Sequence, residues 1–207
     1  MSSIAPVSIH HRIEPEDRAR SDLYALLARL YAAAPDERLL LQIAKAPRIA
    51  PEDTPFARAY NRLSDASSAM DADAARQEYF DLFVGVGKCE VNLHASHWLA
   101  GFMMERPLVE LRADLKRLGV ARRADSQLVE DHLALLFETM RLLVAGDTDF
   151  RPAELDVQRT FFEAHIGSWV FACCDAILGN SIANYYRCVA ELTSVYMAVE
   201  RDSLVME

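Results

Sequence analysis

Residues 126–140 read SQLVEDHLALLFETM, a polar start followed by closely spaced apolar side chains. At about 100° per residue, the apolar side chains from Leu128 to Val144 cover one broad arc of a helix. The remaining narrow sector faces water and holds Gln127, Glu130, Ala134, Glu138 and Arg141. A helix that is apolar over more than half of its circumference normally lies at the centre of its domain. We therefore expect a central helix that runs from about residue 126 to Gly146.

Asp131 and His132 stand side by side near the predicted start of this helix, and Ser126 is its natural N-cap. In a structural interpretation, Asp131 stabilises the positive end of the helix dipole and His132 is a core histidine with one hydrogen bond. In a functional interpretation, a polar pair in an otherwise apolar place serves a partner. Both interpretations are open from the residues alone.

The rest of the chain also favours helices. Only 7 of its 207 residues are glycine, fewer than the average share of about 7%, and stretches rich in Ala, Leu, Arg and Glu favour helix over sheet. No internal repeat is visible. We predict an all-α protein, a single globular helical bundle of about eight or nine helices over residues 16–207. Residues 1–15 contain two prolines and few large apolar side chains, so we expect a mobile N-terminal tail there.

Proline, glycine and capping residues predict where several helices begin and end. Asp36 can cap the second helix, and the proline-dense loop 46–55 ends with Thr54 as the next cap, followed by Pro55. Gly119 is placed to end another helix, and an interruption is expected near Gly167.

Composition also limits the function. The formal net charge of -9 disfavours nucleic acid and suits a cationic partner. No apolar run reaches the roughly 18 to 20 residues of a membrane span, so we expect no stable membrane insertion. The N-terminal residues lack the apolar core of a secretory signal, which predicts a cytoplasmic protein. No CxxC pair is present, so reduced thiols are expected at Cys89, Cys173, Cys174 and Cys188.

An enzymatic alternative uses the histidines. His94 and His97 have i, i+3 spacing, and with Asp131 and His132 they could serve a metal-dependent hydrolase or lyase. The HExxH spacing, the GxSxG elbow and the phosphate-binding loops are all missing. We therefore predict no metal, no cofactor and no catalytic activity. A third alternative is a helical scaffold that binds a folded protein through its acidic surface.

Aromatic and aliphatic side chains alternate in EYFDLFVG, residues 78–85, just before a glycine turn. Aromatic residues at helical spacing belong to the core more often than to a binding site. The helix nevertheless ends here, and the loop that follows could open a groove. An acidic protein with such apolar helix ends suits a peptide in which positive charge precedes an apolar stretch.

A family resemblance covers most of the chain. The segments EYFDLFVGVGKCEVNLHASHW (78–98) and RPLVELRADLKRLGV (106–120), followed by DH before a Leu-rich helix, resemble the TorD/DmsD/NarJ family of molybdoenzyme maturation chaperones. The resemblance implies an all-helical protein without catalytic machinery. It also implies that the protein binds the twin-arginine signal peptide, or another segment, of an apo molybdenum-cofactor oxidoreductase subunit, which it holds back from export until the cofactor is inserted.

The family's motifs fall on definite positions here. Its LFxG element falls on residues 82–85, its xSxY/W element on Ser96 and Trp98, and its DH pair on Asp131 and His132. The peptide-binding residues expected from the pattern and the resemblance are Tyr79, Phe80, Leu82, Phe83, Gly85, Ser96, Trp98, Asp131 and His132. The chaperone itself is expected to be a monomer or a homodimer.

This chain departs from the family pattern in three places. Val86 follows Gly85 where the family often has proline, and Asn92-Leu93 replace a Pro-Pro pair. The Glu-Pro that normally precedes the DH pair is Leu128-Val129 here. These differences mark a divergent branch, so the resemblance implies the fold more firmly than it implies the client or the local loop geometry.

Overall fold

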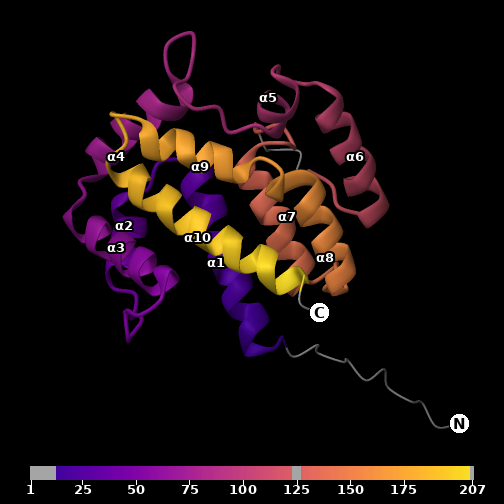
Figure 1. Cartoon of the computed structure of the whole chain (residues 1–207), viewed down its shortest axis with the longest axis horizontal. Helices are drawn as coiled ribbons and strands as arrows, with labels where there is room; N and C mark the ends of the chain where they lie inside the picture. The colour runs from indigo at the N-terminus through magenta and orange to yellow at the C-terminus, as the bar shows by residue number, and fades with distance from the viewer. Residues whose placement is uncertain (1–12, 123–126, 206–207) are drawn as a thin grey trace, which may run out of the picture.

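The computed structural model describes residues 13–122 and 127–205, which are helical over most of their length (Figure 1). The helices, with two π-helical segments η1 and η2, are α1 (Pro15–Ala32), α2 (Glu37–Ala44), α3 (Pro55–Ala69), α4 (Ala72–Tyr79), η1 (Phe80–Val84), α5 (Ala95–Ala100), α6 (Arg106–Leu118), α7 (Leu133–Ala145), α8 (Leu155–Phe162), η2 (Glu163–Gly167), α9 (Val170–Gly179) and α10 (Tyr185–Val205).

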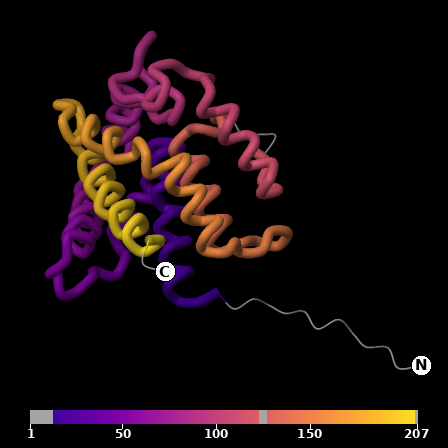
Figure 2. The backbone as a smooth tube through the Cα atoms, turned by 45° about the vertical axis from the view of Figure 1, so that its right-hand side comes forward, coloured from indigo at the N-terminus to yellow at the C-terminus, as the bar shows by residue number. Residues whose placement is uncertain are grey.

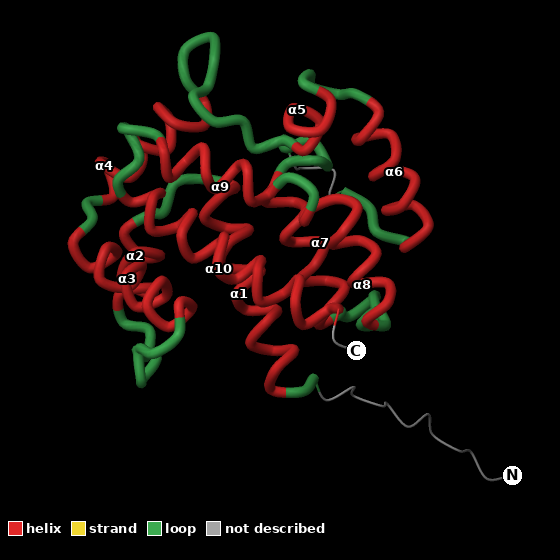
Figure 3. Tube along the Cα trace, in the orientation of Figure 1, coloured by secondary structure: helices red, strands yellow, loops and turns green. Residues whose placement is uncertain are grey.

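The predicted all-α class is confirmed, because the described residues contain no strand, only one isolated β-bridge (Figure 3). The helices are more numerous than predicted because the stretch that breaks near Gly167 divides into α8, η2 and α9. Of the predicted N-terminal tail, residues 1–12 lie outside the described part, and α1 already begins at Pro15.

The core forms around α1 and α7, which pack against each other along their length. Tyr24 and Tyr31 of α1 and Phe137 of α7 are fully buried, with ring centroids 5.9 and 6.0 Å apart between each tyrosine and the phenylalanine. α10 packs against α3 and α9, and α2 packs against α3. Figures 1 and 2 show α5 and α6 at the opposite side of this centre from α2 and α3. The central position predicted for the Leu-rich helix is confirmed.

The predicted start of that helix is wrong. α7 begins at Leu133 with His132 as its N-cap, whereas Ser126, the predicted cap, lies outside the described residues. Residues 127–132 are not helical, because their backbone pairs with a segment far away in the sequence: Ala95 N donates to Asp131 O and Leu133 N to Leu93 O. Asp131 therefore does not lie in the first turn of its own helix.

Most other predicted helix ends are confirmed. Asp36 caps α2 by accepting from Leu39 N, and Thr54 caps α3 by accepting from Ala57 N. Gly119 ends α6 in the left-handed region with φ 73°.

Glu78 joins α4 to the start of α10. Its buried carboxylate accepts from three successive backbone N–H groups, those of Asn184 at 2.8 Å, Tyr185 at 3.0 Å and Tyr186 at 2.8 Å. The first N–H groups of a helix have no partner within the helix, and a carboxylate there also faces the positive end of the helix dipole. Glu78 therefore caps a helix that begins more than one hundred residues later in the chain.

A second buried carboxylate, Glu200, ties the other end of α10 to α1. Arg20 donates to both of its oxygens, at 2.9 and 3.0 Å, and Tyr24 Oη donates to one of them at 2.9 Å. Arg20 also donates to Gln158 of α8. Because the side chain of Glu200 is only 2% exposed, the bidentate pair lies away from solvent.

Within residues 13–122 and 127–205, no single helix is long and apolar enough to cross a membrane. The bent pair Leu155–Gly167 and Val170–Gly179 passes this test only as a pair, by length and composition alone.

Candidate functional site

Three of the sequence motifs meet around one extended segment, Val91–His94. Val91 N donates to Leu82 O at 2.9 Å, which joins this segment to η1. At its other end, Ala95 N donates to Asp131 O at 3.0 Å and His94 forms an antiparallel β-bridge with His132. The LFxG, xSxW and DH elements, widely spaced in the sequence, therefore share one backbone frame.

Asp131 is the buried centre of this frame. One carboxylate oxygen, Oδ2, accepts from Ser96 N at 3.0 Å and from Ser96 Oγ. Since Ser96 lies in the first turn of α5, Asp131 caps that helix and not its own. The other oxygen, Oδ1, is buried and has no hydrogen-bond partner among the described residues. Asp131 itself is only 1% exposed, and an unpaired buried oxygen of this kind is costly.

His132 and His94 lie together beside this carboxylate, with ring centroids 4.9 Å apart and nearly perpendicular planes. Ala134 N donates to His132 Nδ1 at 3.2 Å, so Nδ1 is the unprotonated ring nitrogen. Burial lowers the pKa of His132 from 6.5 to about 3, and the neighbouring His94 adds to this effect. Burial also lowers the pKa of His94, although Asp131 opposes that shift. Both imidazoles are therefore neutral at neutral pH.

The lowered pKa of His132 predicts a loss of stability in weak acid. Below pH 6.5 the unfolded chain protonates this histidine while the folded chain keeps it neutral, so acid favours unfolding. From pH 6.5 to about pH 5, this one group removes about 2 kcal/mol of the free energy of unfolding. Urea unfolding of the wild type and of His132→Asn at both pH values measures this loss of unfolding free energy. Asparagine keeps the N-cap acceptor but does not titrate.

His97→Asn is the matched control, since His97 is an exposed histidine in α5, three residues after His94. We expect the control to lose stability with acid as steeply as the wild type, whereas His132→Asn loses about 2 kcal/mol less. If the unfolding free energy of all three proteins fell equally with pH, His132 would not be the group responsible.

Asn92 is a site residue that the sequence prediction missed. Its side-chain Oδ1 accepts from His94 N at 2.9 Å, and its backbone oxygen accepts from Trp98 Nε1 at 2.7 Å. Its amide nitrogen lies 3.6 Å from Met103 Sδ. Asn92 thus holds the bridged segment, Trp98 and the turn after α5 in one arrangement. An asparagine side chain often bonds the backbone N–H two residues on, and this tendency is the signal that could have identified it.

Most of the predicted aromatic residues pack toward the core. The Phe83 ring lies 5.3 Å from that of Tyr79 and 4.9 Å from that of Tyr186. Tyr79 Oη donates to Tyr31 O at 3.1 Å, and Leu82 is fully buried. Phe80 differs, with 40% of its surface exposed at the start of η1. Of this group, only Phe80 offers a large apolar surface to a partner in the structure described.

Gly85 ends η1 in a conformation that only glycine fits well. Its φ is +62°, and a Cβ atom would lie 2.4 Å from Lys88 O and 3.0 Å from Lys88 C. Both obstructing atoms belong to the backbone, so a larger residue would force the turn to move. Gly85 therefore shapes the loop between η1 and the bridged segment.

Exposed apolar side chains precede and follow the bridged segment in the chain, some in η1 and the loop after it and others in α5 and the turn after it. We call them the 80–104 surface: Phe80, Val84, Val86, Leu99, Phe102, Met103 and Met104. Val86 is 94% exposed and Phe102 72%. Glu90 and Glu105, within the same stretch, are exposed and form no ion pair in the described part of the chain.

The four residues of the enzymatic alternative are only partly brought together. His94, Asp131 and His132 are neighbours, whereas His97 is exposed and its ring lies against Trp98 at 5.8 Å. In the described residues, no group of three or more His, Cys, Asp or Glu side chains is arranged to hold a metal ion. The geometry therefore gives a metal-dependent reaction no support here.

Comparisons with known proteins give a family and a similar fold for this chain. Residues 50–175 match the family described as the nitrate reductase delta subunit. The fold is similar to the crystal structure of a candidate redox enzyme maturation protein from Archaeoglobus fulgidus, with a TM-score of 0.54 and 14% identity over 96% of this chain and 99% of that one. No curated protein matches the chain. Because the family match covers more than half of the sequence, the chain belongs to the nitrate reductase delta subunit family, and its resemblance to the TorD/DmsD/NarJ chaperones is confirmed.

Proposed function

We propose that this protein is a cytoplasmic maturation chaperone for a molybdenum-cofactor oxidoreductase. It binds the twin-arginine signal peptide of the apo subunit and holds the subunit until the cofactor is inserted, before export. It catalyses no reaction of its own. Family membership supports the general role, and the 80–104 surface is the observation that carries the peptide-binding part.

The 80–104 surface is suited to the apolar part of a signal peptide. Its exposed side chains include a phenylalanine and two methionines in direct succession, at 102–104. Methionine side chains are flexible and adapt to varied apolar partners. Large exposed apolar patches mark sites of protein interaction. The buried aromatic residues anchor η1 to the core, and Gly85 shapes the loop after it. Neither need touch the peptide.

The arginines of the peptide would meet acidic groups nearby. Glu90 and Glu105 carry no partner cation in the described structure, which leaves them available for a first electrostatic contact. Asp131 Oδ1 lacks a donor, and a guanidinium supplies donors of the right kind. Because Asp131 is only 1% exposed, an arginine reaches Oδ1 only after the residues that cover it move. Peptide binding is therefore coupled to a local rearrangement around Asp131.

Titration of the purified protein with signal peptides tests this proposal directly. We expect a twin-arginine peptide to bind with a Kd in the micromolar range, since ordering a disordered peptide costs part of the interaction energy. A Lys-Lys version should bind about tenfold more weakly, because lysine cannot form the bidentate contact. The variant Asp131→Asn should bind both peptides with nearly equal affinity.

Phe102→Ser is expected to raise the Kd of the twin-arginine peptide and of its Lys-Lys version by about tenfold or more, since the apolar contact is lost. Val199→Ser is its matched control, because Val199 is an exposed apolar residue on α10, 51% exposed, outside the 80–104 surface. A scrambled peptide that binds as tightly as the authentic one would refute peptide recognition. Capture of a mature, cofactor-loaded oxidoreductase from cells, in place of an immature one, would favour the scaffold alternative.

A further inference from the structure

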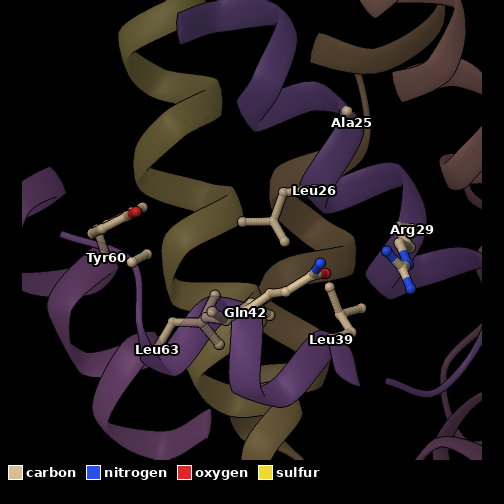
Figure 4. A pocket seen from close by; sticks show the side chains of 9 residues that line it. Ala25, Leu26, Arg29, Leu39, Gln42, Tyr60 and Leu63 are labelled. Carbon is tan, nitrogen blue, oxygen red and sulfur yellow. The ribbon is translucent and has the colours of Figure 1, made fainter. Parts of the chain in front are cut away.

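A separate hollow lies between α1, α2 and α3, on the side of the molecule away from α5 (Figures 1 and 4). Its volume is about 300 Å³. Figure 4 shows Leu26 of α1 and Leu63 of α3 pointing into it, with Gln42 of α2 between Leu63 and Leu39. Ile43 and Tyr60 complete an apolar lining that the described residues leave open to solvent.

A second hollow, a shallow and open one of about 440 Å³, lies along the outer face of α2, is lined by residues of α2 and its C-cap alone, and shares Gln42 with the first. Its lining includes Leu41, an apolar side chain that is 48% exposed. The two hollows therefore lie side by side along one short helix. Each offers apolar contact at a different helical position of α2, as a surface that receives two side chains of one partner helix requires.

Two cations beside the second hollow have no acidic partner among the described residues of an otherwise acidic protein. Arg38 and Lys45 line the second hollow, are exposed, and form no ion pair among the described residues. Arg29 lines the first hollow and lies 3.8 Å from Asp36, whose carboxylate also caps α2. Glu37 is the acidic residue in the lining of the second hollow. In a chain with a net charge of -9, two unpaired cations beside exposed apolar hollows favour an anionic partner.

The size of the hollows favours a protein partner over a small molecule. The first lies at the lower limit of ligand sites, which usually enclose about 300–1,000 Å³ and bury most of the ligand. An open hollow of this size accommodates one large apolar side chain. An amphipathic helix presents such side chains at i, i+3, i+4 and i+7 and carries charges on its flanks.

We propose that α2, with the two hollows beside it, is a docking site for an acidic amphipathic helix of a protein partner. One leucine or phenylalanine of that helix enters the hollow beside Leu26 and Leu63, and a second lies against Leu41. Carboxylates on the flanks of the helix pair with Arg38 and Lys45. This site is independent of the 80–104 surface. It selects an acidic segment, whereas the 80–104 surface is proposed to bind a basic one.

NMR titration of the ¹⁵N-labelled protein with synthetic helices tests the proposal. The peptides have about 16 residues, roughly four turns, with leucine or phenylalanine at i, i+3, i+4 and i+7. One set carries glutamate on its flanks, a second carries lysine, and a third has glutamate flanks with serine in place of the apolar residues. We expect the first set to shift the amide signals of Leu26, Gln42 and Ile43, with a Kd at least tenfold lower than the others.

Two protein variants complete the test. Arg38→Glu together with Lys45→Glu should lower the affinity for the acidic peptides by about tenfold or more and raise the affinity for the basic ones. Ala25→Phe, which fills the first hollow, should abolish the shifts. Lys116→Glu, an exposed lysine on α6, is the charge control and should change nothing.

Absence of binding by every acidic peptide, or equal binding of acidic and basic ones, would overturn the proposal. Binding to phosphatidylglycerol vesicles that depends on Arg38 and Lys45, without any peptide binding, would overturn it in favour of a lipid surface. A dimer in sedimentation that dissociates only in the Arg38→Glu, Lys45→Glu variant would overturn it in favour of a second copy of the chain.

Discussion

Glu200→Ala is expected to lower the free energy of unfolding by about 3–5 kcal/mol, as for other buried ion pairs that lose one partner. The substitution removes the two Glu200 oxygens that accept from Arg20 and Tyr24, while these two donors stay in the core and Arg20 keeps only Asp17 and Gln158 as acceptors. The guanidinium is only 17% exposed, so water replaces the lost carboxylate poorly. Denaturant unfolding followed by circular dichroism measures the loss.

Glu191→Ala is the control on the same helix. Glu191 pairs with Arg62, but the side chains of this pair are 31% and 58% exposed. Exposed pairs contribute about 0–1 kcal/mol, so the control should unfold nearly as the wild type does. If both variants lost the same amount, the burial of the Glu200 pair would not be the cause.

Glu78→Ala should have an effect of similar size, about 3–5 kcal/mol, because three backbone donors lose their acceptor at once. The loss should appear first at the start of α10. Hydrogen exchange of the Tyr185 and Tyr186 amides should therefore accelerate more than that of amides in the middle of this helix.

Gln77→Ala tests whether any change in α4 has the same result. Gln77 is exposed, and its hydrogen bond to Asp81 also lies at the surface. We expect a change within about 0.5 kcal/mol and unaltered exchange at Tyr185. Faster exchange in this variant would show that α4 as a whole, and not the Glu78 carboxylate, protects the start of α10.

Local patterns were sufficient to predict the helices and most of their ends. Apolar periodicity identified the central helix, and its burial against α1 follows from the width of its apolar arc. Thr54, Asp36 and Gly119 act on neighbours within four residues, so their roles can be inferred from a short window of sequence.

Roles that depend on distant partners could not be predicted in this way. Asp131 appeared to serve the helix that follows it, but it caps α5, because the backbone of Asp131 and Leu133 pairs with that of residues 93–95. Glu78 and Glu200 gave no signal at all, since nothing near them in the sequence indicates α10 or Arg20 as a partner. Periodicity assigns a residue to a face of its own helix and cannot identify a helix brought near by the fold.

The candidate site was predicted in part. The family motifs located the frame formed by Ser96, Asp131 and the residues around them, but not Asn92, which takes the place of a family proline. Exposure could not be inferred from these motifs. Phe80 and Phe102 are open to solvent while Leu82 is buried, and this difference depends on how η1 and α5 pack.

The β-bridge at the base of this frame also bears on how the protein can evolve. Because Ala95 N and Asp131 O lie 3.0 Å apart, the segment between them, which includes α5 and α6, begins and ends at a single point. The entropy of closing a loop grows only slowly with its length, so insertions within this segment cost little at its base. A change of length in the turn between α5 and α6 should therefore leave the bridge and the packing of α1 against α7 in place.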